Sequence, residues 1–143
     1  TGAGVDAKPG GMLVDGTMAI VGIGVDIARI SRIAQSIDRY GDRFLRRVYH
    51  PSEIAFSQTR RNGMEFLAAC FAVKEAALKA LSDFPGRGIA WSDIYISHAL
   101  TGKPILHLEG RALVLAKEKG VRLYHVTLSH DGDMAVAQVV LES

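Results

Sequence analysis

The stretch FAVKEAALKA, Phe71 to Ala80, constrains the fold of this chain more than any other part of the sequence. It holds charged residues within an otherwise apolar run that lacks Gly and Pro, a pattern typical of a helix whose buried stripe borders an ionic face. Glu75 and Lys79 lie one helical turn apart and therefore share a face. Because such a pair is also common on ordinary helix surfaces, the stretch alone leaves a structural and a functional interpretation open.

The chain has 143 residues, of which 48% are hydrophobic, so we expect a single domain with its own core. One cysteine, Cys70, rules out an intrachain disulfide framework and argues against a Cys-based metal site. No apolar run approaches the roughly 18 residues of a membrane span, and the first residues lack the charged and apolar regions of a signal peptide. We therefore expect a soluble protein of the reducing cytoplasm.

Positive charge is concentrated between Arg29 and Arg47. Six arginines stand there against two aspartates, a net charge of +4 compared with +2 for the whole chain. Such a segment indicates either a solvated helix face or a surface for an anionic partner, such as nucleic acid, a phosphorylated ligand or an acidic protein.

Residues 1–17 are rich in Gly and small residues and show no periodicity, so we expect a disordered leader ahead of a domain spanning residues 18–143. The run AIVGIGVDIA that begins at Ala19 predicts a buried strand that delivers Asp26 at its end. Gly22 and Gly24 suit a close approach of another backbone. No further glycine completes a dinucleotide-binding fingerprint, which excludes a Rossmann motif.

Helices are predicted in the first half of the chain and again near its end. Ser31 is expected to cap a first helix that ends near Gly41. The predicted helices after it comprise a short one starting at His50–Glu53, the long central one from Gly63 to about Ser82 and a last one over Arg111–Lys119, closed by Gly120. Asn62 and Glu65 are expected to form a capping box, and residues 83–88 to end the central helix.

Strands dominate the second half. We expect a hairpin made of Asp93–His98 and Ile105–Leu108, joined by a turn over Thr101–Pro104. The runs Val121–Ser129 and Met134–Leu141 predict a second hairpin. Asp131 and Gly132 are expected to occupy its two-residue turn, with His130 and Asp133 as the flanking pair. The expected fold is a single small α+β domain with one long central helix packed on an antiparallel sheet.

Three residues distant in the sequence carry potential chemistry: Asp26, Glu75 and His130. Two carboxylates that meet form a hard-oxygen site, for which Mg²⁺ completed by water and substrate phosphates is the natural metal. Lys79 would add positive charge beside the same phosphates. The alternative assigns each residue a separate structural role: Asp26 as a helix cap, Glu75 with Lys79 as a surface pair, and His130 as a turn histidine. The turn Gly102–Lys103–Pro104 either contacts an anion or is an ordinary hairpin turn.

Four motifs, GIGVDIARI, EFLAACFAVKEAALKAL, TGKP and VTLSHDGDMAVAQVV, occur in the order and at the separations found in one known family. The chain resembles the holo-acyl-carrier-protein synthases, the small bacterial 4′-phosphopantetheinyl transferases, from about Ile20 to Glu142. The resemblance implies transfer of 4′-phosphopantetheine from coenzyme A to a serine of apo acyl carrier protein, with release of adenosine 3′,5′-bisphosphate. It also implies a requirement for Mg²⁺.

The resemblance assigns roles to individual residues. It makes Asp26 and Glu75 the Mg²⁺ ligands and Lys79 the contact to the pyrophosphate. The expected coenzyme A contacts further comprise Gly102, Lys103, Pro104, Ser129 and His130. Arg32 and Arg43 fall where the family's basic residues contact the carrier protein, with Arg39, Arg46 and Arg47 as lesser contributors.

The same resemblance implies a homotrimer with active sites between subunits, and neither nucleic acid nor membrane as a partner. Glu75, acting directly or through metal-bound water, is the candidate base for the serine proton, with His130 as a second candidate. Cys70 occupies a position where many relatives carry an arginine, so a coenzyme A phosphate contact is expected to be absent there unless Arg60 or Arg61 replaces it. The competing interpretation is a non-catalytic module that binds carrier protein or nucleotide.

Overall fold

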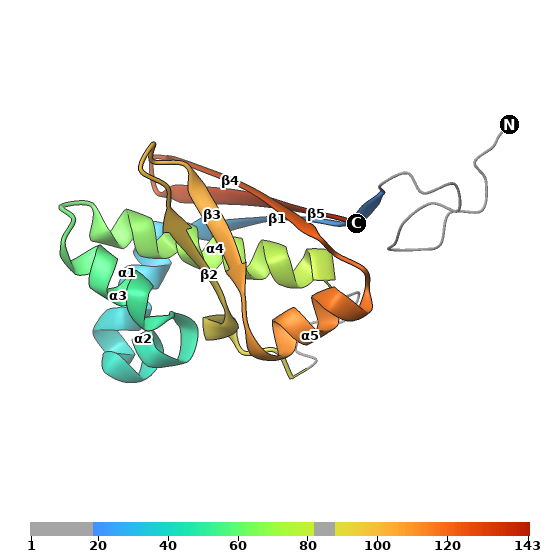
Figure 1. The fold of residues 1–143 in the computed structure, drawn as a ribbon. Coiled ribbons are helices and arrows are strands. Elements are labelled where there is room, and N and C mark those ends of the chain that lie inside the picture. The colour runs from blue at the N-terminus through green and yellow to red at the C-terminus, as the bar shows by residue number, and fades with distance from the viewer. Residues whose placement is uncertain (1–18, 82–87) are drawn as a thin grey trace, which may run out of the picture.

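The computed structural model describes residues 19–81 and 88–143 (Figure 1). The expected leader, Met18 and most of the segment expected to end the central helix lie outside the described residues. The elements, in chain order, are β1 (Ile20–Arg29), α1 (Ile30–Tyr40), α2 (Asp42–Val48), α3 (Pro51–Gln58), α4 (Gly63–Leu81), the short 3₁₀ helix η1 (Trp91–Asp93), β2 (Ile94–His98), β3 (Pro104–Leu108), α5 (Gly110–Glu118), β4 (Leu123–Asp131) and β5 (Met134–Glu142).

The central helix α4 lies against a three-stranded antiparallel sheet with strand order β1-β5-β4, and β2 and β3 form a separate hairpin (Figure 1). The sheet covers one side of α4, while α1, α2 and α3 gather near its N-terminal half. This arrangement confirms the predicted α+β domain with a long helix on an antiparallel sheet. Within the described ranges, no helix is long and apolar enough to cross a membrane.

Strand β1 and helix α4 touch backbone to backbone. A Cβ atom added to Gly22 would lie 1.9 Å from the carbonyl oxygen of Ala80, and one added to Gly24 would lie 1.8 Å from that of Ala76. No side chain fits into either gap, so glycine is required at both positions. The predicted close approach of another backbone is confirmed, and the partner is the helix that carries Glu75 and Lys79.

Two features of the predicted first strand are wrong. The strand continues past Asp26 to Arg29, because β5 pairs with it without interruption, from Asp26 opposite Ala137 to Arg29 opposite Met134. Nor is it buried on both faces. Its outward side chains Ile23, Val25 and Ile27 are 58%, 52% and 58% exposed.

The predicted turn between β4 and β5 is displaced by one residue. Asp131 pairs with Met134, which leaves Gly132 and Asp133 as the two turn residues, and His130 pairs with Ala135. Gly132 has a φ of 57°, and no described non-glycine residue has a positive φ. A positive φ at the first turn position alone is the type II′ pattern, so Gly132 has to stand first.

The prediction that Ser31 caps the N-terminus of α1 is wrong. A distant residue, Asp133, caps this helix instead. Asp133 accepts a hydrogen bond from the Ser31 backbone N–H at 2.9 Å and another from its hydroxyl at 2.5 Å. The Ile30 N–H donates to the carbonyl oxygen of Asp133 at 2.8 Å. These hydrogen bonds from Ser31 lower the pKa of Asp133 below its ordinary value. The β4–β5 turn therefore fixes the start of the arginine-rich helix.

The remaining predicted elements are confirmed with small changes in their ends. His50 stands at the N-cap of α3, where it forms a capping box with Glu53. The apolar segment around Phe44 and Leu45 is itself a helix, α2, separated from α1 by Gly41 at a φ of 59°. The hairpin β2–β3 and helix α5 occur where the sequence predicted them.

Candidate active site

Asp26, Glu75 and Lys79 come together where β1 crosses α4. The Nζ atom of Lys79 lies 3.0 Å from Oδ1 of Asp26 and donates to the carbonyl oxygen of Val25 at 2.9 Å. The Asp26 side chain is 20% exposed and that of Lys79 is 55% exposed, so both remain accessible from solvent. Residues 53 positions apart in the sequence thus form one polar cluster.

The carboxylate of Glu75 is held beside this pair. The indole Nε1–H of Trp91 donates to its Oε1 at 3.0 Å. Burial, followed by the nearby charge of Asp26, raises the pKa of Glu75, whereas the Trp91 hydrogen bond and Lys79 act in the opposite direction. The charge of Asp26 thus acts on Glu75 in the same direction as burial does.

The cluster fits a small, hard cation. Two carboxylates that repel each other are stabilised by a divalent ion between them, and oxygen ligands are those that Mg²⁺ prefers. Within residues 19–81 and 88–143, no three or more His, Cys, Asp or Glu side chains are grouped as a metal site. Any cation at Asp26 and Glu75 would have to complete its coordination with water or substrate oxygens.

Within one chain, His130 and Ser129 lie away from the cluster of Asp26, Glu75 and Lys79. The Nε2 atom of His130 is 3.5 Å from a carboxylate oxygen of Glu65, near the start of α4. Ten residues of helix separate Glu65 from Glu75, a rise of about 15 Å. Ser129 neighbours His130 on β4 but points to the opposite face of the sheet, where it is exposed.

Lys103 and Pro104 also lie away from the carboxylates. They line a groove of about 500 Å³ whose other described walls come from the β2–β3 hairpin and from residues 122–126 of β4 and its approach. Gly102 stands in the turn, with a φ of 90° that suits glycine. A single chain therefore assembles Asp26, Glu75 and Lys79 but leaves the expected coenzyme A residues of β4 and the hairpin apart from them.

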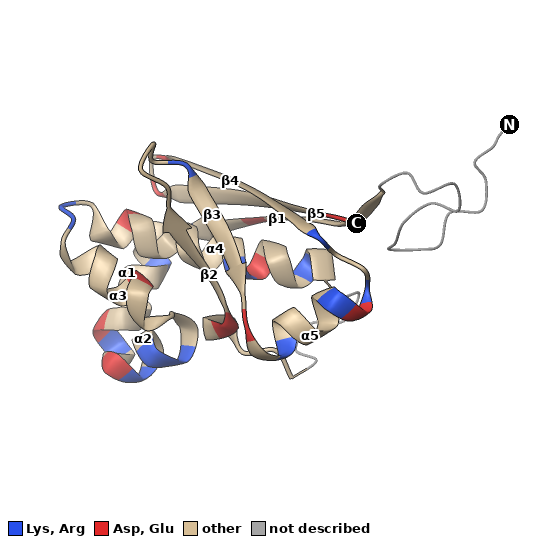
Figure 2. Cartoon of the chain, viewed as in Figure 1, with Lys and Arg blue, Asp and Glu red and all other residues tan. Residues whose placement is uncertain are grey.

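The arginine-rich segment forms an exposed face on α1 and α2 (Figure 2). Arg32 and Arg43 are both exposed. Arg43 borders a pocket of about 440 Å³ between these helices and η1. The residues lining this pocket are Tyr40, Arg43, Phe44, Arg47, Val48 and Trp91.

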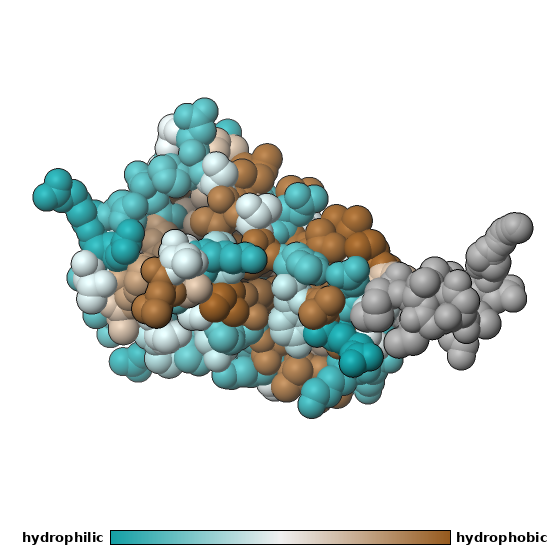
Figure 3. Space-filling model, turned by 45° about the horizontal axis from the view of Figure 1, so that its top comes forward, coloured by the Kyte–Doolittle hydropathy of each residue, from teal (hydrophilic) through white to brown (hydrophobic). Residues whose placement is uncertain are grey.

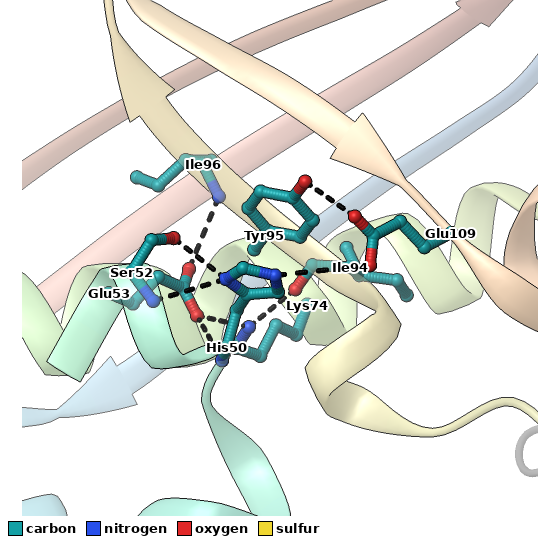
Figure 4. A network of polar contacts seen from close by, with 8 residues as sticks. All are labelled: His50, Ser52, Glu53, Lys74, Ile94, Tyr95, Ile96 and Glu109. Atoms are coloured by element: carbon teal, nitrogen blue, oxygen red, sulfur yellow. Dashed lines mark hydrogen bonds and ion pairs between the residues drawn. The ribbon is translucent and has the colours of Figure 1, made fainter.

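A buried ion pair was not anticipated from the sequence (Figure 4). Lys74 donates to Oε1 of Glu53 at 2.6 Å and also to the carbonyl oxygen of Ile94, and Oε2 of Glu53 accepts from the Ile96 N–H at 3.2 Å. The two side chains connect α3, α4 and the start of β2. The available signal was that the residues one helical turn before and after Lys74 are all apolar, because a lysine on such a face is buried only when it is paired.

The absence of a phosphate contact at Cys70 stays a prediction, and within this chain the position is closed to solvent. Cys70 is fully buried, and burial, followed by the Glu53 carboxylate, raises the pKa of its thiol. Its position therefore faces the Glu53–Lys74 pair and not a ligand in solvent. The guanidinium of Arg60, one of the two suggested replacements, lies 4.9 Å from the ring centroid of Phe56.

Residues 22–139, which include the whole polar cluster, match the family model described as the 4′-phosphopantetheinyl transferase superfamily. The chain belongs to this superfamily. Within it, the chain is 44% identical over 123 residues to a holo-[acyl-carrier-protein] synthase of Koribacter versatilis, covering 86% of this chain and 98% of that protein. It is 47% identical over 124 residues to the holo-[acyl-carrier-protein] synthase of Nitratidesulfovibrio vulgaris, with 87% and 99% covered.

Solved structures of phosphopantetheinyl transferases share the fold. The crystal structure of the holo-[acyl-carrier-protein] synthase from Neisseria meningitidis aligns with a TM-score of 0.79 at 31% identity, over 87% of this chain and 100% of that one. A Bacillus anthracis holo-(acyl-carrier-protein) synthase in complex with CoA (3′,5′-ADP) aligns at 0.71 and 34% identity, with 87% and 97% covered. The chain is thus a transferase of the holo-[acyl-carrier-protein] synthase type.

Proposed function

We propose that this chain transfers 4′-phosphopantetheine from coenzyme A to a serine of apo acyl carrier protein at the cluster of Asp26, Glu75 and Lys79. The transfer itself is the activity of the family to which the chain belongs. The observation that supports this cluster as its site is the meeting of two carboxylates with a solvent-accessible lysine where β1 packs on α4.

Asp26 and Glu75 would hold Mg²⁺, which when bound supplies positive charge to the phosphates of coenzyme A. Lys79 already reaches across to β1 and is more than half exposed, so its ammonium group can contact a phosphate without leaving the cluster. Glu75 and Lys79 lie one turn apart on α4, so a metal ion held by Glu75 and the ammonium group of Lys79 could contact the same pyrophosphate. The chain's own contribution is to place two negative charges and one positive charge at fixed separation.

The attacking serine hydroxyl has to lose its proton. Glu75 is the base that we favour, because burial and Asp26 raise the pKa of its carboxyl and so increase its affinity for a proton. Within the same chain, His130 instead contacts Glu65, which precedes Glu75 by ten residues, a helix rise of about 15 Å. It would reach this cluster only from another subunit.

We further propose a homotrimer in which neighbouring subunits complete each site. Ile23, Val25 and Ile27 form an exposed apolar row on the outer face of β1, and brown hydrophobic patches lie on the side of the molecule that Figure 3 brings forward. Such a row favours burial against another protein surface. Subunit contact would also unite Asp26 and Glu75 with Ser129, His130 and the Gly102–Pro104 turn for coenzyme A binding.

Mixing two inactive variants tests the shared site. Asp26→Ala and His130→Ala subunits, unfolded and refolded together in equal amounts, should regain up to about a quarter of wild-type activity if each site takes one residue from each of two subunits. Separately refolded variants provide the control. Recovery no greater than in the separate samples would place both residues in the same subunit's site or show that His130 is dispensable.

The transfer is tested directly by weighing the carrier. Incubation of the chain with coenzyme A, Mg²⁺ and apo carrier protein should raise the carrier's mass by one phosphopantetheine. Tight binding of the carrier without a mass gain would instead support the alternative, a non-catalytic module. We propose that the enzyme works in the cytoplasm, where a free buried cysteine such as Cys70 stays reduced.

A further inference from the structure

Trp91, the single tryptophan of the chain, lies between the proposed metal site and the arginine-lined pocket. We propose that Trp91 is a positioning residue that holds the Glu75 carboxylate for the metal and transmits carrier binding from the pocket to that carboxylate. The inference rests on the proposed function and adds to it a residue that couples the two binding events.

The segment that carries Trp91 is firmly held. The Asp93 N–H donates to the carbonyl oxygen of Ala90 at 3.0 Å, and the Glu109 N–H donates to that of Asp93 at 2.8 Å. The next residue, Ile94, accepts from the buried ammonium of Lys74. Lys74 and Glu75, adjacent on α4, thus each bind this segment, one at Ile94 and the other at Trp91. The indole is therefore presented to Glu75 by backbone that has little freedom to move.

The hydrogen bond from Trp91 restricts Glu75 in a specific way. An indole N–H donates one hydrogen bond and accepts none, so it can occupy only one lone pair of the carboxylate. Here it occupies Oε1 and leaves Oε2 available for a cation. Groups that bond a ligating side chain in this manner fix its orientation, and their loss usually lowers metal affinity about 10- to 100-fold.

Trp91 also lines the pocket, beside Arg43, Phe44 and Arg47. Two arginines at the rim of an apolar hollow favour an acidic partner that also offers an apolar side chain, and the carrier protein is the acidic partner expected there. Whatever fills the pocket contacts the same indole that binds Glu75. Carrier docking would therefore change the environment of Trp91 and, through it, the orientation of Glu75.

The first test measures metal affinity without turnover. Coenzyme A binding is followed by calorimetry at increasing Mg²⁺, with no carrier present, for wild type, Trp91→Phe and the control Phe71→Leu. The Phe71 ring lies 6.0 Å from the Trp91 ring, so the control disturbs the same packing but leaves the N–H in place. For Trp91→Phe, we expect the Mg²⁺ concentration at half-maximal binding to rise about 10- to 100-fold, and that for the control to change less than about threefold. At saturating Mg²⁺, the kcat of Trp91→Phe should largely return to the wild-type value.

Two outcomes would overturn the positioning role: an unchanged Mg²⁺ requirement in Trp91→Phe, or a loss of binding and kcat that persists at every Mg²⁺ concentration, which would indicate a merely structural residue. A wild type whose coenzyme A binding does not respond to Mg²⁺ overturns the proposed metal site together with the positioning role. If wild type nevertheless transfers phosphopantetheine, the proposed transferase function stands, and only the metal site and the positioning role of Trp91 are wrong.

The second test uses the fluorescence of Trp91, which no other tryptophan obscures. Addition of a tryptophan-free apo carrier protein should shift its emission, and Arg43→Glu should weaken that response while the response to coenzyme A with Mg²⁺ persists. Emission that is unchanged by a carrier shown to bind would contradict the coupling. Transfer activity of the same samples is measured in parallel, so a failed coupling is distinguished from a failed enzyme.

Discussion

The Nζ atom of Lys74 lies 2.6 Å from Oε1 of Glu53, and neither side chain is exposed to solvent. Each buried side-chain nitrogen and oxygen of the described residues, including those of this pair, has at least one hydrogen-bond partner. Burying two charges costs nearly as much as their attraction returns, but removing only one of them leaves the other unpaired. The pair therefore stabilises the domain only as long as both partners are present.

Lys74→Met should destabilise the domain by about 3–5 kcal/mol, because it leaves the Glu53 carboxylate buried without its cation. The double variant Glu53→Gln, Lys74→Met should be markedly less destabilised than the sum of the two single variants. Urea unfolding of all four proteins measures the interaction energy. Single variants within about 1 kcal/mol of wild type would show that the pair does not support the junction of α3, α4 and β2.

Asp26→Ala and Glu75→Ala should each remove most transfer activity and leave the fold intact. Since both are proposed to act through one metal ion, the double variant should be hardly worse than either single variant. Glu118→Ala, an exposed carboxylate on α5, provides the control for a charge change. Losses in kcat/KM that multiply in the double variant would mean that the two carboxylates act independently.

Glu75→Gln should stabilise the metal-free protein at neutral pH. Because burial and Asp26 raise the folded-state pKa of Glu75, the wild type loses stability as the pH rises from the ordinary value of 4.5 through that folded-state pKa. A glutamine stays neutral and avoids this loss, and the Trp91 N–H can still donate to it. Thermal unfolding in EDTA between about pH 4 and pH 8 should show a Tm advantage for the variant that grows with pH. A variant less stable than wild type at pH 7 would show that Lys79 and Trp91 outweigh the burial cost.

Arg32→Glu and Arg43→Glu should raise KM for the carrier protein far more than KM for coenzyme A, with little change in kcat at saturating carrier. Charges at the rim of an interface mainly steer encounter and are screened by salt. Raising the salt from about 0.05 M to about 0.3 M shortens the Debye length from roughly 14 Å to roughly 6 Å and should weaken wild type more than the variants. Arg111→Glu on α5 makes the same charge change away from this surface. If the two test variants behave like this control, the carrier docks elsewhere.

The cluster of Asp26, Glu75 and Lys79 was predicted from local signals together with the resemblance to a known family, because the local signals alone left separate structural roles open. Helical spacing placed Glu75 and Lys79 on one face, and two glycines beside Asp26 indicated close backbone contact. The order of the four motifs then identified the family. The prediction that Asp26 ends its strand failed because the length of a strand depends on its partner, and β5 continues to pair as far as Arg29.

Contacts between distant residues could not be predicted from local pattern. Asp133 lies 102 residues from Ser31 and caps α1 only because the β4–β5 hairpin folds back beside it. Trp91 is 16 residues from Glu75, in a different element, and nothing in its own neighbourhood indicates a carboxylate partner. The position of the β4–β5 turn was missed by one residue because an Asp-Gly and a Gly-Asp turn can both be drawn from the letters Asp131, Gly132 and Asp133.

Because Gly22 and Gly24 contact the backbone of α4, the distance between β1 and α4 at the active site is set by main-chain atoms alone. In most domains the distance between a strand and the helix over it follows the volume of the side chains between them, and it drifts as those side chains are replaced. Here hydrogen atoms stand where side chains would be, and the strand already touches the carbonyl oxygens of Ala76 and Ala80. Substitutions elsewhere in the core should therefore leave the distance between Asp26 on β1 and Glu75 on α4 unchanged. Two glycines are enough to keep this distance constant while other core residues vary.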